Sequence, residues 1–183
     1  MELIRTEDIS NYCRQTTANE SLKAKILADV DSFIVRKNLG AKFYTELVAD
    51  CDSNDYSYTK YAPFMEGTNY NDECGNLMYM NGLKKCIAYY CYSRICRESV
   101  LESTKYGMVQ KSGDYSVAPS KAQIDALSDS YKGMADEMLK ECISYALLCK
   151  KNGDSIFNNV LYGKRNTNIT DYIIINKIGE EYV

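Results

Sequence analysis

The chain has 183 residues, of which 45% are hydrophobic and 26% charged, and its formal net charge is −3. This length and apolar content are enough to bury the core of one globular domain. The weakly acidic balance excludes a uniformly basic nucleic-acid-binding surface. The first ten residues lack the basic start and apolar run of a signal peptide, and no later segment has the long uncharged run of a membrane span. We therefore expect a soluble chain, made and kept in a cytoplasm, with no membrane contact.

The first part of the chain predicts two helices. Residues 6–15 begin with Thr6, a suitable N-cap, and acidic residues follow it in the first turn. From Asn19 the apolar residues recur at helical spacing as far as Leu39. The predicted inward positions of this second helix are Leu22, Ile26, Val30, Phe33 and Ile34.

A corner between two helices is predicted at Gly40. Glycine can take the positive φ of a helix C-cap without the cost of a Cβ, and a new helical pattern begins at Ala41. The apolar residues on both sides should pack together as two short faces that meet at the turn. This structural corner consists of Phe33, Leu39, Gly40, Phe43, Tyr44 and Leu47.

A long polar loop is predicted for residues 50–73, which are rich in Asp, Asn, Ser and Tyr. One helical turn is expected within it, near residues 62–65. A loop has little core in which to bury large rings, and exposed tyrosine supplies contact area at protein interfaces. We therefore predict contacts with another subunit for Tyr56, Tyr58 and Tyr61.

The second half predicts a central helix over residues 76–102 and a last long helix that Ser120 caps and that ends near residues 152–153. Between them, residues 103–119 alternate weakly and contain two glycines, which favours an extended excursion or a small hairpin. Residues 172–178 have high strand propensity and no obvious partner in a helical body.

These elements together predict an all-α fold: a bundle of about four to five helices with a long Tyr-rich loop, an extended excursion and a C-terminal β-like arm. The helical domain would span residues 1–163, and the docking arm residues 164–183.

The residue types needed for common catalytic sites are missing. The chain has no histidine, so Ser-His-Asp and Cys-His arrangements are excluded, and it has no glycine-rich phosphate loop. Cys86, Cys91 and Cys96 recur every fifth residue of a predicted helix, and each is therefore rotated by about 140° from the last, which prevents closure around one metal. We expect the eight cysteines to be reduced and mostly buried.

Two other patterns imitate metal sites. The pairs Glu98 with Glu102 and Glu137 with Glu141 lie at i,i+4, but most charge on amphipathic helices faces water. The run from Asp50 resembles the start of a calcium loop, yet it lacks the glycine and the bidentate glutamate that such a loop requires. We expect no metal, no cofactor and no enzymatic activity.

The order of the motifs resembles the head-completion or head-tail connector (adaptor) proteins of tailed bacteriophages, in the divergent form found in phages and prophages of Bacteroides-type bacteria. The residues that carry the resemblance lie in the corner, in the central helix and in the excursion. They are Phe33, Ile34, Leu39, Gly40, Phe43, Tyr44, Leu47, Gly82, Leu83, Ala88, Tyr89, Thr104, Gly107, Val109, Lys111, Tyr115 and Ser116.

The resemblance implies a structural virion protein of the neck, assembled in the bacterial host cytoplasm. Copies would form a ring, typically of twelve, beneath the portal protein, and would offer a platform for the next neck or tail protein. DNA would pass through the channel without sequence-specific binding. The excursion would reach neighbours through Tyr106, Val109, Lys111 and Tyr115, and the arm would add a strand to a partner sheet through Tyr172, Ile173, Ile174 and Ile175.

Two other interpretations stay open. The chain can be a monomeric helical module that binds or regulates one partner through its tyrosine-rich face. A metal-dependent carboxylate enzyme is the third interpretation, and it would need a metal site that the sequence does not locate.

Overall fold

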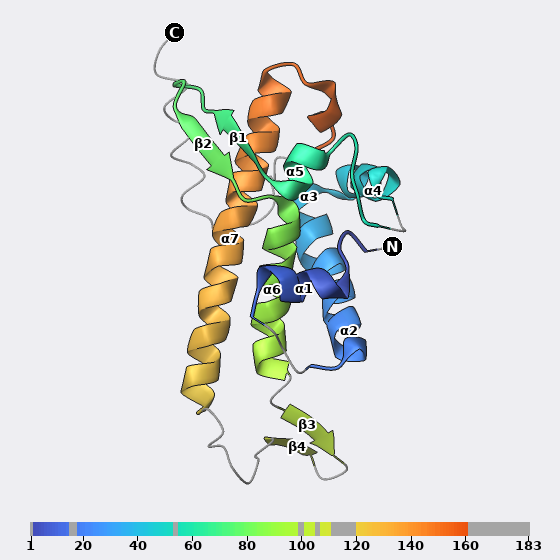
Figure 1. Cartoon of the computed structure of the whole chain (residues 1–183), viewed down its shortest axis with the longest axis vertical. Helices are drawn as coiled ribbons and strands as arrows, with labels where there is room; N and C mark the ends of the chain where they lie inside the picture. Colours follow the sequence, from blue (N-terminus) through green and yellow to red (C-terminus); the bar gives the residue numbers. More distant parts are fainter. Residues whose placement is uncertain are drawn as a thin grey trace.

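A computed structural model describes residues 2–14, 18–52, 55–98 and 120–160, together with the backbone of residues 101–104 and 107–110 (Figure 1). The described part is mostly helical, which confirms the predicted helical bundle, and two β-hairpins are added to it. The helical elements are α1 (Thr6–Tyr12), α2 (Glu20–Val30), the π-helical turn η1 (Asp31–Val35), α3 (Arg36–Leu39), α4 (Ala41–Asp50), α5 (Ala62–Glu66), α6 (Leu83–Glu98), α7 (Lys121–Lys151) and the 3-10 turn η2 (Ser155–Phe157). The strands are β1 (Thr68–Asn71), β2 (Leu77–Met80), β3 (Leu101–Thr104) and β4 (Gly107–Gln110).

The helix α6 is the centre of the body, with α1 and α2 packed on one side and α7 on the other (Figure 1). The contact between α6 and α7 uses small side chains, which allow two helices to approach closely. Ser93 and Ser128 are buried there and exchange hydrogen bonds: the Ser93 hydroxyl donates to the Ser128 carbonyl at 2.9 Å, and the Ser128 hydroxyl to the Ser93 carbonyl at 2.8 Å. The Cys86 thiol donates to the Ala135 carbonyl at 3.3 Å in the same way. Each of these buried polar groups is therefore satisfied by the neighbouring helix.

The predicted helix starts at Asn19 and Ser120 are confirmed by their capping bonds. The Asn19 side chain accepts from the Leu22 N–H at 2.7 Å. Ser120 and Gln123 form a reciprocal capping box, in which the Gln123 N–H donates to the Ser120 hydroxyl and the Ser120 N–H to the Gln123 side chain. These local bonds satisfy backbone donors that have no partner inside the helix.

The corner at Gly40 is confirmed, with a φ of 90° at Gly40 and buried side chains at Leu39, Phe43 and Leu47. The prediction for Phe33 is wrong, because this side chain is 71% exposed. The cause is the π-helical turn η1, in which one additional residue per turn rotates the following side chains out of phase. Val35 takes the inward position instead.

The central helix was predicted too long, because residues 77–80 form the strand β2 and the helix starts only at Leu83. The strand pairs antiparallel with β1, from Thr68 opposite Met80 to Asn71 opposite Leu77. The turn between them depends on Asp72, whose carboxylate accepts from the N–H groups of Cys74 and Asn76 at 2.9 and 2.8 Å. The predicted loop 50–73 is therefore only partly a loop, although its expected helical turn is confirmed as α5.

The excursion also contains a hairpin, in which β3 pairs antiparallel with β4 and Glu102 lies opposite Val109. The hairpin begins at Leu101, two residues before the predicted excursion. Figure 1 places it beyond the end of α6, at the opposite end of the body from the β1–β2 hairpin. Tyr106, Lys111 and Tyr115 lie outside the described residues, as do the predicted arm 164–183 with Tyr172, Ile173, Ile174 and Ile175.

Two glycines join the β1–β2 hairpin to the body by close backbone contact. Gly67 has a φ of 101° and Gly82 a φ of 85°. A Cβ on Gly82 would lie 2.5 Å from the Glu66 carbonyl carbon and 2.6 Å from the Gly67 nitrogen. Because these neighbours are backbone atoms, they cannot move aside as a flexible side chain would.

We predict that Gly82→Ala lowers the free energy of unfolding by more than about 3 kcal/mol, because it adds a steric clash to the strain of a positive φ. The matched control is Gly75→Ala, which has a φ of 83° but no atom within 4 Å of the added Cβ. This control should cost only about 1–2 kcal/mol. Urea unfolding of both variants measures the difference, and equal losses would contradict the close contact at Gly82.

Candidate interaction surface

The Tyr-rich loop does not provide the exposed cluster that its sequence predicts. Tyr58 is 7% exposed and Tyr61 is 1% exposed, so the prediction that these rings are available to another subunit is wrong. The ring of Tyr61 packs at 5.4 Å from Phe43 and at 6.1 Å from Phe157, and its hydroxyl donates to the Ile156 carbonyl at 3.2 Å. The loop folds back onto the body, and its tyrosines complete the core.

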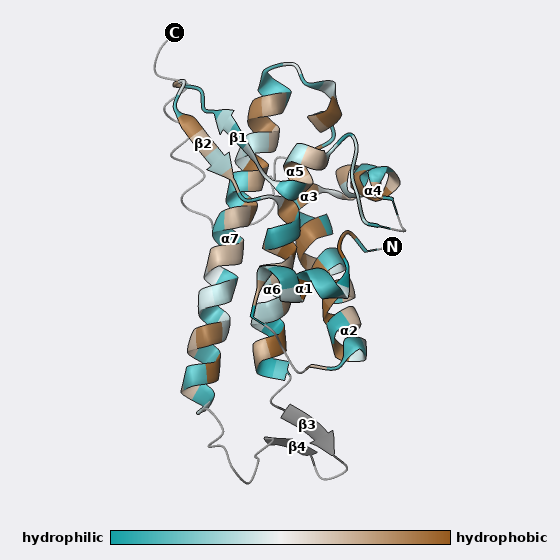
Figure 2. Cartoon of the chain, in the orientation of Figure 1, coloured by the Kyte–Doolittle hydropathy of each residue, from teal (hydrophilic) through white to brown (hydrophobic). Residues whose placement is uncertain are grey.

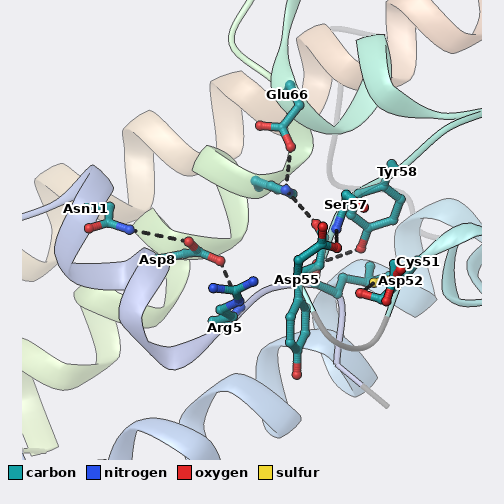
Figure 3. Close-up of polar contacts among 12 residues, drawn as sticks. Arg5, Asp8, Asn11, Cys51, Asp52, Asp55, Ser57, Tyr58 and Glu66 are labelled. Carbon is teal, nitrogen blue, oxygen red and sulfur yellow. Dashed lines mark hydrogen bonds and ion pairs between the residues drawn. The ribbon is translucent and has the colours of Figure 1, made fainter.

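One buried lysine holds this loop in place. The Lys84 ammonium group on α6 donates to the Tyr56 carbonyl at 2.8 Å and forms an ion pair with Glu66. It also lies 5.2 Å from the centre of the Tyr58 ring, and the Tyr58 hydroxyl donates to the Leu3 carbonyl at 2.6 Å. Figure 3 shows Tyr58, Glu66 and the loop residues Asp55 and Ser57 together with Arg5 and Asp8 of the amino-terminal segment.

Tyr56 is the predicted interface tyrosine that stays partly exposed. Its φ is 56°, which is unusual for a residue other than glycine, and its ring lies 5.5 Å from the Arg5 guanidinium carbon. The Asp52 carbonyl accepts from the Tyr56 N–H at 2.7 Å, and the Asp55 carboxylate accepts from the Ser57 N–H at 2.9 Å. These bonds give the loop a defined shape at the surface (Figure 3).

The exposed apolar side chains lie instead on three separate elements. Phe33 is 71% exposed on η1, and Leu127 and Met134 are 37% and 40% exposed one heptad apart on α7. On β2, Leu77 is 73% exposed and Tyr79 is 58% exposed. Figure 2 shows the hydrophobic start of β2 on the projecting hairpin. A contiguous exposed apolar patch is informative, because association can bury it, whereas single exposed apolar residues are normal at a protein surface.

The two faces of the β1–β2 hairpin differ. Side chains that lie opposite each other in an antiparallel pair share a face, so Tyr70 and Met78 lie on one face and Tyr79 on the other. On the first face the Tyr70 ring packs on α7, 5.2 Å from that of Tyr145, while Met78 is 44% exposed. The second face carries Leu77 and Tyr79 and is open to solvent. Sequence reasoning missed this surface because it assigned both residues to a helix.

Three carboxylates of the acidic pairs have described side chains, and each contacts a basic or amide side chain; the side chain of Glu102 lies outside the described residues. Glu98 lies 3.7 Å from Arg94, Glu137 forms an ion pair with Lys140 at 2.9 Å, and Glu141 accepts from the Asn81 amide at 3.2 Å. Within the ranges that the structure describes, no group of three or more His, Cys, Asp or Glu side chains is placed to hold a metal ion.

The described cysteines are all free thiols, and several are buried, as the sequence predicts. Burial raises the pKa of Cys142 to about 12 and holds that of Cys86 well above its usual value. Because the thiolate is the reactive form, these side chains act as small core residues.

None of the helices in the described part is long and apolar enough to cross a membrane.

Among the residues with described side chains, Asp31 at the start of η1 is the one buried carboxylate. Its Oδ2 atom accepts from the Leu3 N–H at 3.1 Å and lies 3.5 Å from the Tyr44 hydroxyl, while Oδ1 is buried without a hydrogen-bond partner among the described residues. Burial raises the pKa of Asp31 to about 6, against the lowering effect of the Leu3 N–H; Glu2 raises it further.

These observations define the protein as a helical-bundle protein with two hairpins and with exposed apolar side chains on η1, β2 and α7. A family profile described as a family of unknown function (DUF6712) matches residues 35–167, which is well over half of the chain. The chain therefore belongs to this family. The matched range includes the corner residues from Leu39 to Leu47, both hairpins and the helices α3 to α7, and it begins after Phe33. No curated protein and no solved structure matches the chain.

We predict that Lys84→Met loosens the loop between α4 and α5 and lowers the free energy of unfolding by about 2–3 kcal/mol, because hydrogen bonds to a charged group are lost and Glu66 is left unpaired. Limited proteolysis should then cut residues 52–60 faster. Lys151→Met is the matched control, since its ion pair with Glu73 is exposed and should contribute less than about 1 kcal/mol. An equal effect of the two variants would contradict the role of Lys84.

A second prediction concerns pH. The folded pKa of Asp31 lies above the unfolded value, so the folded state binds more protons between pH 4 and pH 6. The contribution of Asp31 to stability is therefore complete at low pH and decreases by about 3 kcal/mol as the pH rises through about 6. Asp31→Asn should remove this decrease, because it keeps an acceptor for Leu3 without the charge. Chemical denaturation from pH 4 to pH 8 measures the slope, and an unchanged slope in the variant would refute the assignment.

Proposed function

We propose that the protein is a structural virion protein that forms a ring at the head-tail interface of a tailed bacteriophage, between the portal and the next neck or tail protein. The observation that supports this proposal is the distribution of large exposed apolar side chains over η1, β2 and α7. A protein with one partner needs one such surface. A ring subunit needs separate surfaces for its two neighbours and for the proteins above and below it.

The shape of the body also supports the proposal. The two hairpins lie at opposite ends of the α6–α7 pair (Figure 1), so one subunit can reach proteins on both sides of a ring. The helical body between them would make the contacts from subunit to subunit. In such a ring each interface is heterologous, because a surface on one side of a copy meets a different surface of the next.

Phe33 is the residue that we assign to the contact between subunits. It belongs to the motif that carries the resemblance, yet the π-helical turn places it outside the core. Single-turn π-helical segments occur frequently at functional sites. Burial of this ring against a neighbour would recover about 2–3 kcal/mol of hydrophobic free energy per interface.

We predict that Phe33→Asp prevents incorporation of the chain into particles while its free energy of unfolding changes by less than about 0.5 kcal/mol, because the side chain contributes little to the monomer core. Ser32→Asp is the matched control, since it places the same charge on the adjacent exposed residue. The test is to induce a prophage that carries each variant, purify the particles and count copies of the chain relative to the portal by mass spectrometry.

Equal copy numbers of chain and portal in the wild type, together with loss of the chain in Phe33→Asp alone, would support the proposal. Absence of the wild-type chain from purified particles would refute it. If the absent chain instead copurifies from the host as a one-to-one complex with a nonstructural protein, the monomeric binding module becomes the better interpretation.

A further inference from the structure

The free edge of β2 is the surface that carries a further inference. β1 and β2 form a two-stranded sheet in the described part of the chain, so β2 has a neighbour on one side only. The Asp72 N–H donates to the Asn76 carbonyl at the turn. Because hydrogen-bonded and non-hydrogen-bonded pairs alternate in an antiparallel ladder, the backbone groups of Leu77 and Tyr79 point away from β1.

This edge is a liability for a protein in solution. The same two residues that direct their N–H and C=O groups outward carry the most exposed large apolar side chains of the hairpin, at 73% and 58%. An apolar edge strand of this kind is a template for association with other chains, and natural proteins usually cover it or break it with charge or proline. The sequence of β2, Leu-Met-Tyr-Met, contains neither.

The chain has a segment suited to cover the edge. Residues 172–178, Tyr-Ile-Ile-Ile-Asn-Lys-Ile, are rich in β-branched residues and contain no proline or glycine. Addition of an extended segment to a sheet edge satisfies the backbone groups of both strands, and the side chains on one face provide the apolar contact.

The distance is also suitable. The described chain ends at Val160, three residues after Phe157, whose ring lies 5.8 Å from that of Tyr145; Tyr145 in turn lies 5.2 Å from Tyr70 on β1. The linker of residues 161–171 can span roughly 36 Å when extended, since each residue covers about 3.3 Å. Tethering through a linker of this length gives an effective concentration of about 1 mM, so a segment of the same chain competes well with a second copy.

We infer that residues 172–178 add a third strand to the edge of β2 in the free protein, and thereby cover Leu77 and Tyr79 of the same chain. This contact does not depend on the proposed ring. In an assembly, the segment would exchange this site for a neighbouring protein.

The test is amide hydrogen exchange of the full chain, resolved by NMR at single residues. In the wild type, the N–H groups of Leu77 and Tyr79 should exchange slowly. Ile174→Pro should accelerate both by at least about tenfold, because proline removes a donor and restricts the added strand. The N–H groups of Met78 and Met80, which face β1, report that the hairpin stays folded. Asn168→Pro in the linker is the matched control and should leave all four rates unchanged.

Two results would overturn the inference. Equal exchange rates of Leu77 and Tyr79 in the wild type and in Ile174→Pro would show that the segment does not cover β2. Protection that increases with protein concentration would show that a second copy covers it instead. Because the measurement uses the free protein, absence of the chain from virions would leave this inference intact.

Discussion

The structure depends on the burial of α6 from all sides. Buried side chains occur around the whole circumference of this helix, and they include the polar residues Lys84 and Ser93. A helix of this kind is stable only when other elements cover each of its faces. The helices α1 and α2 cover one side, α7 covers the opposite side, and α5 covers the first turn. The hydrogen bonds between Ser93 and Ser128 fix the contact with α7, and Lys84 fixes the loop that leads to α5.

This arrangement explains where the protein is free to make contacts. The inner faces of the neighbouring elements cover α6. The remaining exposed apolar side chains therefore lie on surfaces that do not pack against α6. Phe33 is on a distorted turn, Leu77 and Tyr79 are on a projecting hairpin, and Met134 is on the outer face of α7. The proposed contact between subunits uses Phe33, and the proposed cover of β2 uses Leu77 and Tyr79, so these two contacts do not compete for the same residues.

The sequence allowed the helices to be predicted where their ends depend on local bonds. Asn19, Gly40 and Ser120 each satisfy a helix end within a few residues of the chain, and all three are confirmed. Predictions failed where the outcome depends on distant residues. The run at Leu77 has the spacing of a helix, but Gly82 and the pairing with β1 make it a strand. Of the predicted interface residues, Tyr58 and Tyr61 are buried, and these two rings of the Tyr-rich loop are therefore part of the core.

The sequence by itself determined the helical class, the helix starts at Asn19 and Ser120, the corner at Gly40 and the absence of histidine chemistry. These properties follow from single residues or from spacing within a few turns, where the interacting groups are close along the chain. The tertiary structure alone decided which apolar residues face solvent. A π-helical turn rotates Phe33 outward, and the contact with Phe43 and Phe157 draws Tyr61 inward. The reason is physical: whether a side chain is buried depends on which residues distant in the sequence pack against it, and the packing of the whole chain determines those contacts.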